Sequence, residues 1–200
     1  MNRRITFLIS SLAGGGAEAV CVNVANSLAA RGWQVDLVVL HMKNSVYHER
    51  LSETVSLVVL GINHARYSPC GLAKYLLINK PQKILIFNYE LTVVAVVLKK
   101  LLRLDIKIIA RNISTFSHKK KQASGLWVKY IVQPLVARFY SGADYIINQC
   151  DAMKEDLLGI YSNKKIKTNV IYNPLNKVVQ EYSKQIDYEK IQKQDYILCV

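Results

Sequence analysis

Short apolar runs alternate along this chain with segments whose apolar residues recur at helical spacing. Residues 5–10 form the first run, and residues 17–31 follow it with a helical pattern that Gly32 ends. The same criteria predict further strands at residues 35–40, 55–60, 83–87, 107–110, 145–148 and 167–172. They predict helices at residues 70–79, 91–104, 126–140 and 151–159, and Pro134 must kink or divide the third of these. Few architectures accommodate strands and helices that alternate in this way.

Strands that are apolar along their whole length, and that helices separate, are typical of a parallel sheet covered on both faces. Right-handed crossovers wind such a sheet in both directions, so we expect an α/β fold with a doubly wound, Rossmann-like parallel sheet. We expect this domain to span residues 1–176. The polar segment 177–195 is predicted to be a linker, and the apolar segment 196–200 the start of a second, truncated domain.

The charge balance points to an anionic partner. The 200 residues contain 27 Lys and Arg against 14 Asp and Glu, a formal net charge of +13. A phosphate-bearing ligand, a nucleic acid or an anionic membrane surface would each suit that charge. The four cysteines form no Cys-x-x-Cys pair, which excludes a local zinc motif and favours a reduced, cytosolic setting. Residues 3–19 resemble a short secretory signal, but glycines interrupt the apolar run and the segment fits the first strand and helix better.

Three consecutive glycines, Gly14, Gly15 and Gly16, follow the first predicted strand and open the first helix. In a doubly wound fold this is where backbone N–H groups and the helix dipole attract phosphate, although a tight turn alone would also use glycine. The spacing of Gly14, Gly16 and Ala19 satisfies the dinucleotide pattern G-x-G-x-x-[GA]. That pattern also needs an acidic residue at the end of the second strand, whereas Asp36 lies at its start, and no Walker A lysine follows. NAD and ATP are therefore disfavoured.

Polar side chains follow two later strands at the same predicted edge of the sheet. Asn88 and Glu90 follow the fourth strand, and Arg111 and Asn112 follow the fifth. We expect them to line the ligand-binding edge, where Arg111 would pair with a phosphate or carboxylate or else reach solvent. Two further residues are predicted to contact the ligand at this edge, namely Glu18, which also suits the helix dipole alone, and His118.

A basic region follows the fifth strand. No acidic residue lies between Asp105 and Asp144, and this stretch contains Lys119, Lys120, Lys121, Trp127 and Lys129. Basic residues beside aromatic ones suit the headgroup layer of an anionic membrane, which we favour over a solvated loop and over a nucleic acid. The histidines are isolated along the chain, so no metal site and no catalytic triad is predicted.

An ordered set of short motifs resembles the amino-terminal half of GT-B-fold glycosyltransferases of family 4, such as those that build bacterial capsule and lipopolysaccharide. The resemblance runs from Ile5 to Asn176 and rests on Gly14-Gly15-Gly16-Ala17-Glu18, Ile109-Ala110-Arg111-Asn112, Ala143-Asp144-Tyr145-Ile146-Ile147, Met153-x-x-Asp156-Leu157 and Val170-Ile171-Tyr172-Asn173-Pro174-Leu175-Asn176. Two positions depart from the family. Asn88-Tyr89-Glu90 stands where a histidine is common, and Cys150 replaces a helix-starting serine, so we expect Asp151 to cap that helix.

The resemblance implies a hexosyltransferase-type enzyme that uses a nucleotide-sugar as co-substrate and no other cofactor or metal, usually with retention. It implies that this half holds a glycan or lipid-linked acceptor, while Gly14–Gly16 face the donor diphosphate. The catalytic residues would lie in the other half, so the 200-residue chain alone is expected to be inactive. We expect it at the cytoplasmic face of the plasma membrane. The alternative is a non-catalytic module that binds phosphate or nucleotide ligands.

Overall fold

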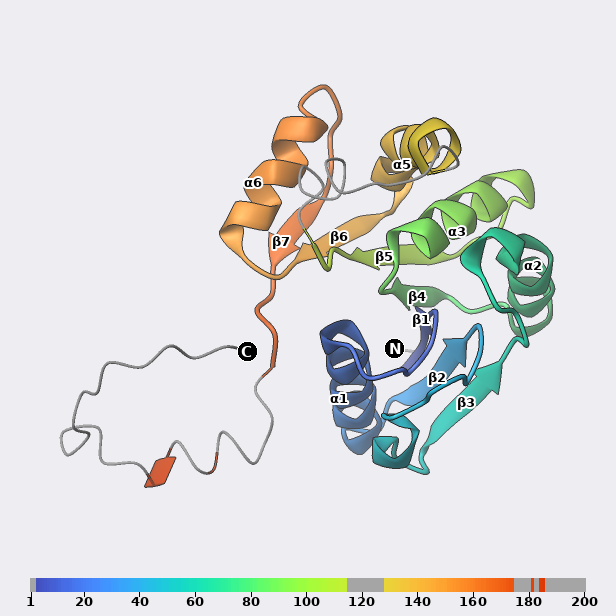
Figure 1. Ribbon diagram of the computed structural model, residues 1–200, viewed down its shortest axis with the longest axis vertical. Helices are drawn as coiled ribbons and strands as arrows, with labels where there is room; N and C mark the ends of the chain where they lie inside the picture. Colours follow the sequence, from blue (N-terminus) through green and yellow to red (C-terminus); the bar gives the residue numbers. More distant parts are fainter. Residues whose placement is uncertain (1–2, 115–127, 175–180, 182–183, 186–200) are drawn as a thin grey trace.

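The computed structural model describes residues 3–114 and 128–174, together with residues 181, 184 and 185 (Figure 1). The predicted linker and the segment after it lie almost wholly outside these residues. Seven parallel strands form a single sheet in the order β3-β2-β1-β4-β5-β6-β7. Their bounds are β1 (Arg4–Ile9), β2 (Gln34–Val39), β3 (Val55–Val59), β4 (Lys83–Ile86), β5 (Lys107–Arg111), β6 (Tyr145–Asn148) and β7 (Thr168–Val170). This order confirms the predicted doubly wound, Rossmann-like sheet.

The helices connect these strands as the apolar spacing predicts. They are α1 (Gly16–Ala30), α2 (Ser68–Asn79), α3 (Tyr89–Leu101), α5 (Gln133–Phe139) and α6 (Asp151–Ile160). The predicted helix over 126–140 is divided, because a π-helical segment, η3 (Val128–Val132), precedes α5 and Pro134 lies in the first turn of α5. A proline is tolerated there because first-turn N–H groups have no partner within the helix. Three short 3-10 turns at His48–Arg50, Ala65–Tyr67 and Tyr140–Gly142 were not predicted.

One capping expectation is wrong. The residue that caps α6 is Cys150, whose side chain makes no capping hydrogen bond, and Asp151 is the first helical residue. The Asp151 carboxylate instead accepts a hydrogen bond from the hydroxyl of Tyr172, at 3.0 Å. An acidic residue in the first turn still suits the helix dipole. Asp151 therefore stabilises the start of α6 through its charge and not through a capping hydrogen bond.

The winding direction reverses between β1 and β4. The central strand β1 pairs with β2 on one side and β4 on the other, so that Phe7 lies beside both Leu37 and Leu85. The chain runs from β1 to β2 and β3, then returns across the sheet to β4. The carboxyl ends of β1 and β4 therefore form the topological switch point, where open α/β sheets bind ligands.

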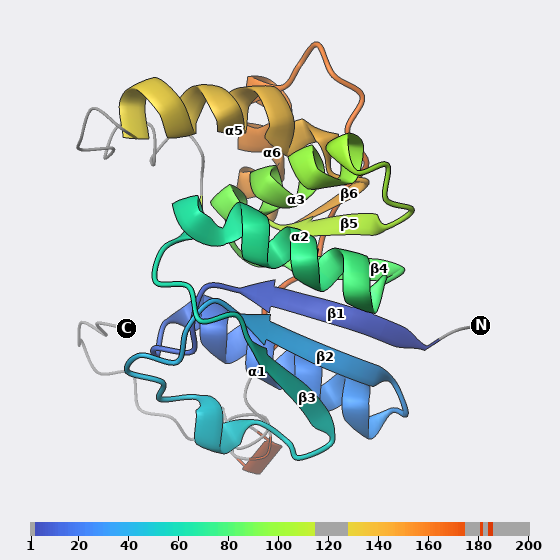
Figure 2. The same cartoon turned by 90° about the vertical axis from the view of Figure 1, so that its right-hand side faces the viewer.

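Helices pack on both faces of the sheet through separate apolar clusters. On one face, Cys21 and Val22 of α1 pack against Phe7 and Phe87, whose rings lie 5.9 Å apart. The other face is covered by α2 and α3, and next to them by α5 and α6, where Leu157 joins Ala110 and Ile146. Figure 2 shows α2, α3 and α5 in front of the sheet and α1 behind it.

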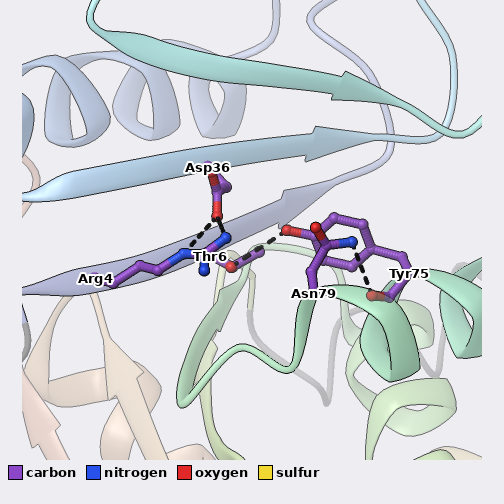
Figure 3. Close-up of polar contacts among 5 residues, drawn as sticks. All are labelled: Arg4, Thr6, Asp36, Tyr75 and Asn79. Atoms are coloured by element: carbon purple, nitrogen blue, oxygen red, sulfur yellow. Dashed lines mark hydrogen bonds and ion pairs between the residues drawn. The ribbon is translucent and has the colours of Figure 1, made fainter.

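The amino edge of the sheet has a polar network of its own (Figure 3). Arg4 donates from Nε and Nη2 to Oδ2 of Asp36, at 3.1 and 2.9 Å. The hydroxyls of Thr6 and Tyr75 lie 3.5 Å apart, and Asn79 donates to the Tyr75 carbonyl. Asp36, the third residue of β2, is thus engaged away from the carboxyl edge, as expected. A ribose at the switch point would find no carboxylate from this residue.

Within the described part of the chain, no helix combines the length and the apolar character that crossing a bilayer requires.

Candidate functional site

The glycine bend lies exposed at the carboxyl end of β1. Gly14 has a φ of +107°, which side-chain-bearing residues rarely adopt, and Gly15 is the extended residue that precedes α1. A Cβ built on Gly16 would meet no atom within 4 Å, so neither packing nor backbone conformation requires glycine there. An open first helical residue at the switch point is what close approach of a ligand to the backbone needs.

Asn88, which follows β4, bonds to Ser10, which follows β1. Its Oδ1 accepts a hydrogen bond from the Ser10 backbone N–H at 2.9 Å, and its Nδ2 donates to Ser10 Oγ at 3.3 Å. Both side-chain atoms thus serve the connection between β1 and β4. The predicted contact of Asn88 with an acceptor stays a prediction, while its hydrogen bonds to Ser10 give it a positioning role.

Glu18 folds back over the bend that precedes it. A Cβ on Gly15 would meet the Glu18 carboxylate, the end of a flexible side chain, which would then have to shift. Burial raises the pKa of the neighbouring Cys21 thiol, the Glu18 charge raises it further, and the Arg111 charge opposes both. The charges of the Glu18 carboxylate and the Arg111 guanidinium therefore both act on the same stretch of α1.

Arg111 is buried, with 6% of its surface exposed. Its Nη2 donates to Oδ1 of Asn173, and its Cζ lies 6.0 Å from the ring centroid of Phe87. Its Nε–H has no hydrogen-bond partner among the described residues. Burial lowers its pKa, and the Cys21 thiol counteracts this. The alternative in which Arg111 extends to solvent is wrong for this structure.

Asn112 is also buried, but its amide is used inside the sheet. It donates to Oδ1 of Asn148 at 3.0 Å, and Asn148 donates in turn to Oγ1 of Thr168 at 2.6 Å. These hydrogen bonds join the carboxyl ends of β5 and β6 to the first residue of β7. Contact of Asn112 with a ligand therefore stays a prediction. The sequence analysis gave no site role to Asn148 or to Asn173, which it quoted only within a family motif.

Glu90 lies in the first turn of α3, beside Tyr89. Burial and the adjacent Glu90 carboxylate both raise the pKa of the Tyr89 hydroxyl. Glu90 is half-buried, so its carboxylate is placed at the predicted edge but is not withdrawn from solvent.

The predicted membrane-contact region is described only in part. His118, Lys119, Lys120, Lys121 and Trp127 lie outside the described residues. Lys129 is exposed, and its Nζ lies 5.5 Å from the centroid of the Tyr130 ring. The next apolar side chains, Tyr130, Ile131 and Leu135, are 65%, 38% and 41% exposed. An exposed apolar strip beside basic residues is typical of an interfacial helix.

No group of three or more His, Cys, Asp or Glu side chains is placed to hold a metal ion within the described ranges. Three cysteines are free in the same ranges: Cys21 is buried, Cys70 exposed and Cys150 intermediate. The carboxyl edge of the sheet thus carries the exposed start of α1, the buried guanidinium of Arg111 at the end of β5, and the first-turn carboxylates of Glu18 and Glu90. Groups of these kinds are the ones that bind anions and hydroxyls in proteins.

Fold and edge together place the chain among the doubly wound domains of GT-B architecture. The family model of Glycosyltransferase Family 4 matches residues 14–177, and the chain belongs to this family. No curated protein matches the chain in sequence.

Solved structures share the fold at low identity. The lipopolysaccharide outer core galactosyltransferase WaaB in its apo form superposes with a TM-score of 0.61 at 14% identity, covering 86% of this chain and 46% of that one. HepE of Anabaena, in complex with UDP and glucose, gives a TM-score of 0.61 at 17% identity, covering 90% and 50%. Sucrose-phosphate synthase of Thermosynechococcus elongatus gives 0.63 at 14%, covering 85% and 48%. The chain thus spans about half the length of these structures.

Proposed function

We propose that this chain is the amino-terminal, acceptor-side half of a bacterial glycosyltransferase that transfers a hexose from a nucleotide-sugar to a lipid-linked glycan, as in capsule or lipopolysaccharide assembly. The observation that carries the proposal is the exposed glycine bend at the switch point, together with family membership. Retention of configuration, metal independence and inactivity of the 200-residue chain alone belong to the same proposal and rest on the family resemblance.

The role of the bend follows from charge. When the sugar leaves the donor, negative charge accumulates on the departing diphosphate. The first N–H groups of α1 have no partner within the helix and carry the positive end of its dipole, so they would stabilise that charge without reorganising. HepE, which shares the fold, was solved with UDP and glucose bound, which supports a nucleotide-sugar as the donor for this chain as well.

The acceptor would lie on the other side of the bend. Glu18 and Glu90 offer carboxylates that accept hydrogen bonds from sugar hydroxyls, and Arg111 offers a guanidinium. Asn88 and Asn112 hold the strand ends on which these groups stand, since their amides bond to Ser10 and Asn148. In this proposal all five residues belong to the surface that binds the acceptor, and no catalytic base lies in this half.

A titration of backbone amides tests the donor role. The amide signals of Gly14–Gly16 in the 200-residue chain should shift when UDP is added and stay unchanged with uridine, which lacks the phosphates. Gly16→Val should abolish the shift without loss of stability, because its Cβ meets open space. Gly159→Val is the matched control, since a Cβ there also meets nothing within 4 Å. If UDP leaves the three glycine amides unmoved at millimolar concentration, the proposal fails.

The membrane partner is proposed on charge and exposure. The net charge of +13 and the exposed strip of Tyr130, Ile131 and Leu135 beside Lys129 support peripheral attachment at the inner face of the plasma membrane. Sedimentation with vesicles of anionic lipid should bring the chain down, and charge reversal at Lys119–Lys121 should weaken it. Equal sedimentation of the reversed variant, or of the chain with neutral vesicles, would exclude this attachment.

The alternative class is a non-catalytic binding module for phosphate or nucleotide ligands. It shares the amide response to UDP, so the two are separated by transfer. The module predicts that UDP binds while no sugar reaches a membrane-extract acceptor, whatever second domain is supplied. The proposed function predicts transfer once a family 4 donor-side half is present.

A further inference from the structure

Arg111 is the only charged side chain in the buried core of the described residues. It is also without a counter-charge, because the ion pairs found there are Arg4–Asp36 and Lys99–Asp144. Those two pairs are partly exposed, at 38% and 17% for the first and 26% and 32% for the second. The most deeply buried cation of the described residues therefore has no carboxylate partner among them.

The Arg111 side chain also has incomplete hydrogen bonding. Its Nη2 donates to the neutral amide oxygen of Asn173, and its Nε–H has no acceptor within the part of the chain that the structure describes. A buried cation without an opposite charge is unfavourable, and a buried donor without an acceptor adds to that cost. Such an arrangement is explained when a ligand supplies the missing charge and the missing acceptor.

The guanidinium of Arg111 lies where a ligand at the carboxyl edge of the sheet could reach it. Arg111 ends β5 on the face that α1 covers, because Ile109, two residues before it, packs in the α1 cluster with Phe87. Its charge and that of Glu18 both act on the Cys21 thiol of α1. The guanidinium thus lies on the same face as the glycine bend, one strand beyond the switch point.

The hydrogen bond from Arg111 to the Asn173 side chain is easily replaced. Asn173 is exposed, and its other side-chain bond, from Nδ2 to Oε1 of Gln149, is long at 3.2 Å and exposed. Its oxygen stands where an anion oxygen would form a charge-assisted bond, which is about twice as strong as a neutral one. An anion would therefore replace this oxygen without breaking any part of the core.

We propose that Arg111 is a binding residue for a phosphoryl oxyanion, and that the Asn173 side chain holds the guanidinium until the anion replaces it. The planar fork of arginine matches two phosphate oxygens, one at Nε and one at Nη2. No bond is made or broken covalently in this exchange. The inference rests on the proposed function only for the source of the phosphate, which is either the donor diphosphate or a phosphate of a lipid-linked acceptor.

Thermal unfolding of the 200-residue chain in sodium phosphate and in sodium chloride, at equal ionic strength, tests the anion site. Phosphate should raise Tm relative to chloride, because a ligand that binds only the folded state stabilises it. Arg111→Gln should weaken the apparent phosphate affinity about tenfold or more. Arg103→Gln removes the same charge from an exposed position after α3 and should leave the response intact. An equal response in the wild type and Arg111→Gln overturns the proposal, as does an equal loss in both variants.

Asn173→Asp gives a test that does not depend on Arg111→Gln folding. The new carboxylate would pair with the guanidinium at the position where the amide oxygen lies, so Tm without phosphate should rise and the phosphate response should disappear. Asn173→Ala removes the competing oxygen and should keep or strengthen the phosphate response. A full phosphate response in Asn173→Asp would overturn the exchange.

Two further probes assign the phosphate. An Arg111-dependent rise in Tm with UDP assigns the site to the donor, and one with a short prenyl phosphate assigns it to the acceptor. An Arg111-dependent phosphate response without any UDP effect on the Gly14–Gly16 amides would refute the proposed donor role and uphold the anion site. The reverse result would refute the anion site alone.

Discussion

Asn88 uses both ends of its side-chain amide on a single residue, Ser10, which lies 78 positions earlier in the chain. Oδ1 accepts from the Ser10 backbone N–H at 2.9 Å and Nδ2 donates to Ser10 Oγ at 3.3 Å. Ser10 follows β1 and Asn88 follows β4, so this pair sets the spacing of the two strand ends at the switch point. The glycine bend begins four residues after Ser10, so the position of Ser10 also limits where the bend lies.

Replacement of this amide should affect both stability and the bend. Asn88→Ala removes two hydrogen bonds and leaves the Ser10 N–H without its partner, which should cost about 1–3 kcal/mol of unfolding free energy. Urea unfolding measures the loss, and the Gly14–Gly16 amide signals should move at the same time. Asn79→Ala is the control, since Asn79 makes one bond, to the Tyr75 carbonyl, at the other edge of the sheet. Equal stability losses in the two variants, with the glycine signals unmoved, would contradict the positioning role.

The glycines of the bend should separate into a structural and a functional member. Gly14→Ala puts a side chain at a φ of +107° and should cost about 1–2 kcal/mol. Gly16→Ala adds a methyl to the first turn of α1 with open space around it, so it should be neutral or stabilise by up to about 1 kcal/mol. Denaturant midpoints for both variants decide the matter. A Gly14→Ala chain as stable as Gly16→Ala would contradict the strain argument.

Much of the fold was predictable because the strands are apolar throughout. In β5, Ile109 packs toward α1 while Ile108 and Ala110 pack toward the opposite helices, so both faces demand apolar residues and the run stands out in the sequence. The division before Pro134 was predictable for a local reason, the missing N–H of proline. The 3-10 turn at His48–Arg50 was not, since three residues carry no periodicity.

The site was predictable only as far as the strand order determines it. Placing Gly14, Asn88 and Arg111 at one edge needs nothing beyond parallel strands. Their partners depend on contacts between distant positions. Asn173 bonds to Arg111 across 62 residues and Asn148 bonds to Asn112 across 36, and neither pair has a spacing that marks it. Burial of Arg111 likewise follows from how α1 and the Asn173 segment pack, which single-sequence patterns do not encode.

Asp144 should make stability depend on pH in the acid range. Burial raises the pKa of this carboxyl, but hydrogen bonds from Lys99 Nζ and the Ile108 N–H, with the charges of Lys99 and Lys107, outweigh that and hold the pKa below its usual value. A lowered folded pKa contributes stability above the unfolded value of about 3.9 and loses it as pH falls through the folded value.

Asp144→Asn isolates that contribution. At pH 7 the variant should be less stable by about 1 kcal/mol, the low end for a charged hydrogen bond because the side chain is 32% exposed. The gap between wild type and variant should narrow as urea unfolding is repeated toward pH 3. Asp105→Asn, at an exposed carboxylate just before β5, should show little difference at either pH. A gap that is as wide at pH 3 as at pH 7 would mean that the charge of Asp144 does not stabilise the fold.

The exposed strip on η3 and α5 should distinguish interfacial insertion from charge attraction alone. Leu135→Glu puts a charge among Tyr130 and Ile131 without disturbing the core, because Leu135 is already 41% exposed. If apolar side chains enter the headgroup layer, sedimentation with anionic vesicles should fall several-fold, and high salt should not remove all of the wild-type binding. Leu101→Glu adds the same charge at a 73% exposed position at the end of α3 and should reduce binding only slightly. Equal losses in the two variants would show that net charge, and not this strip, governs attachment.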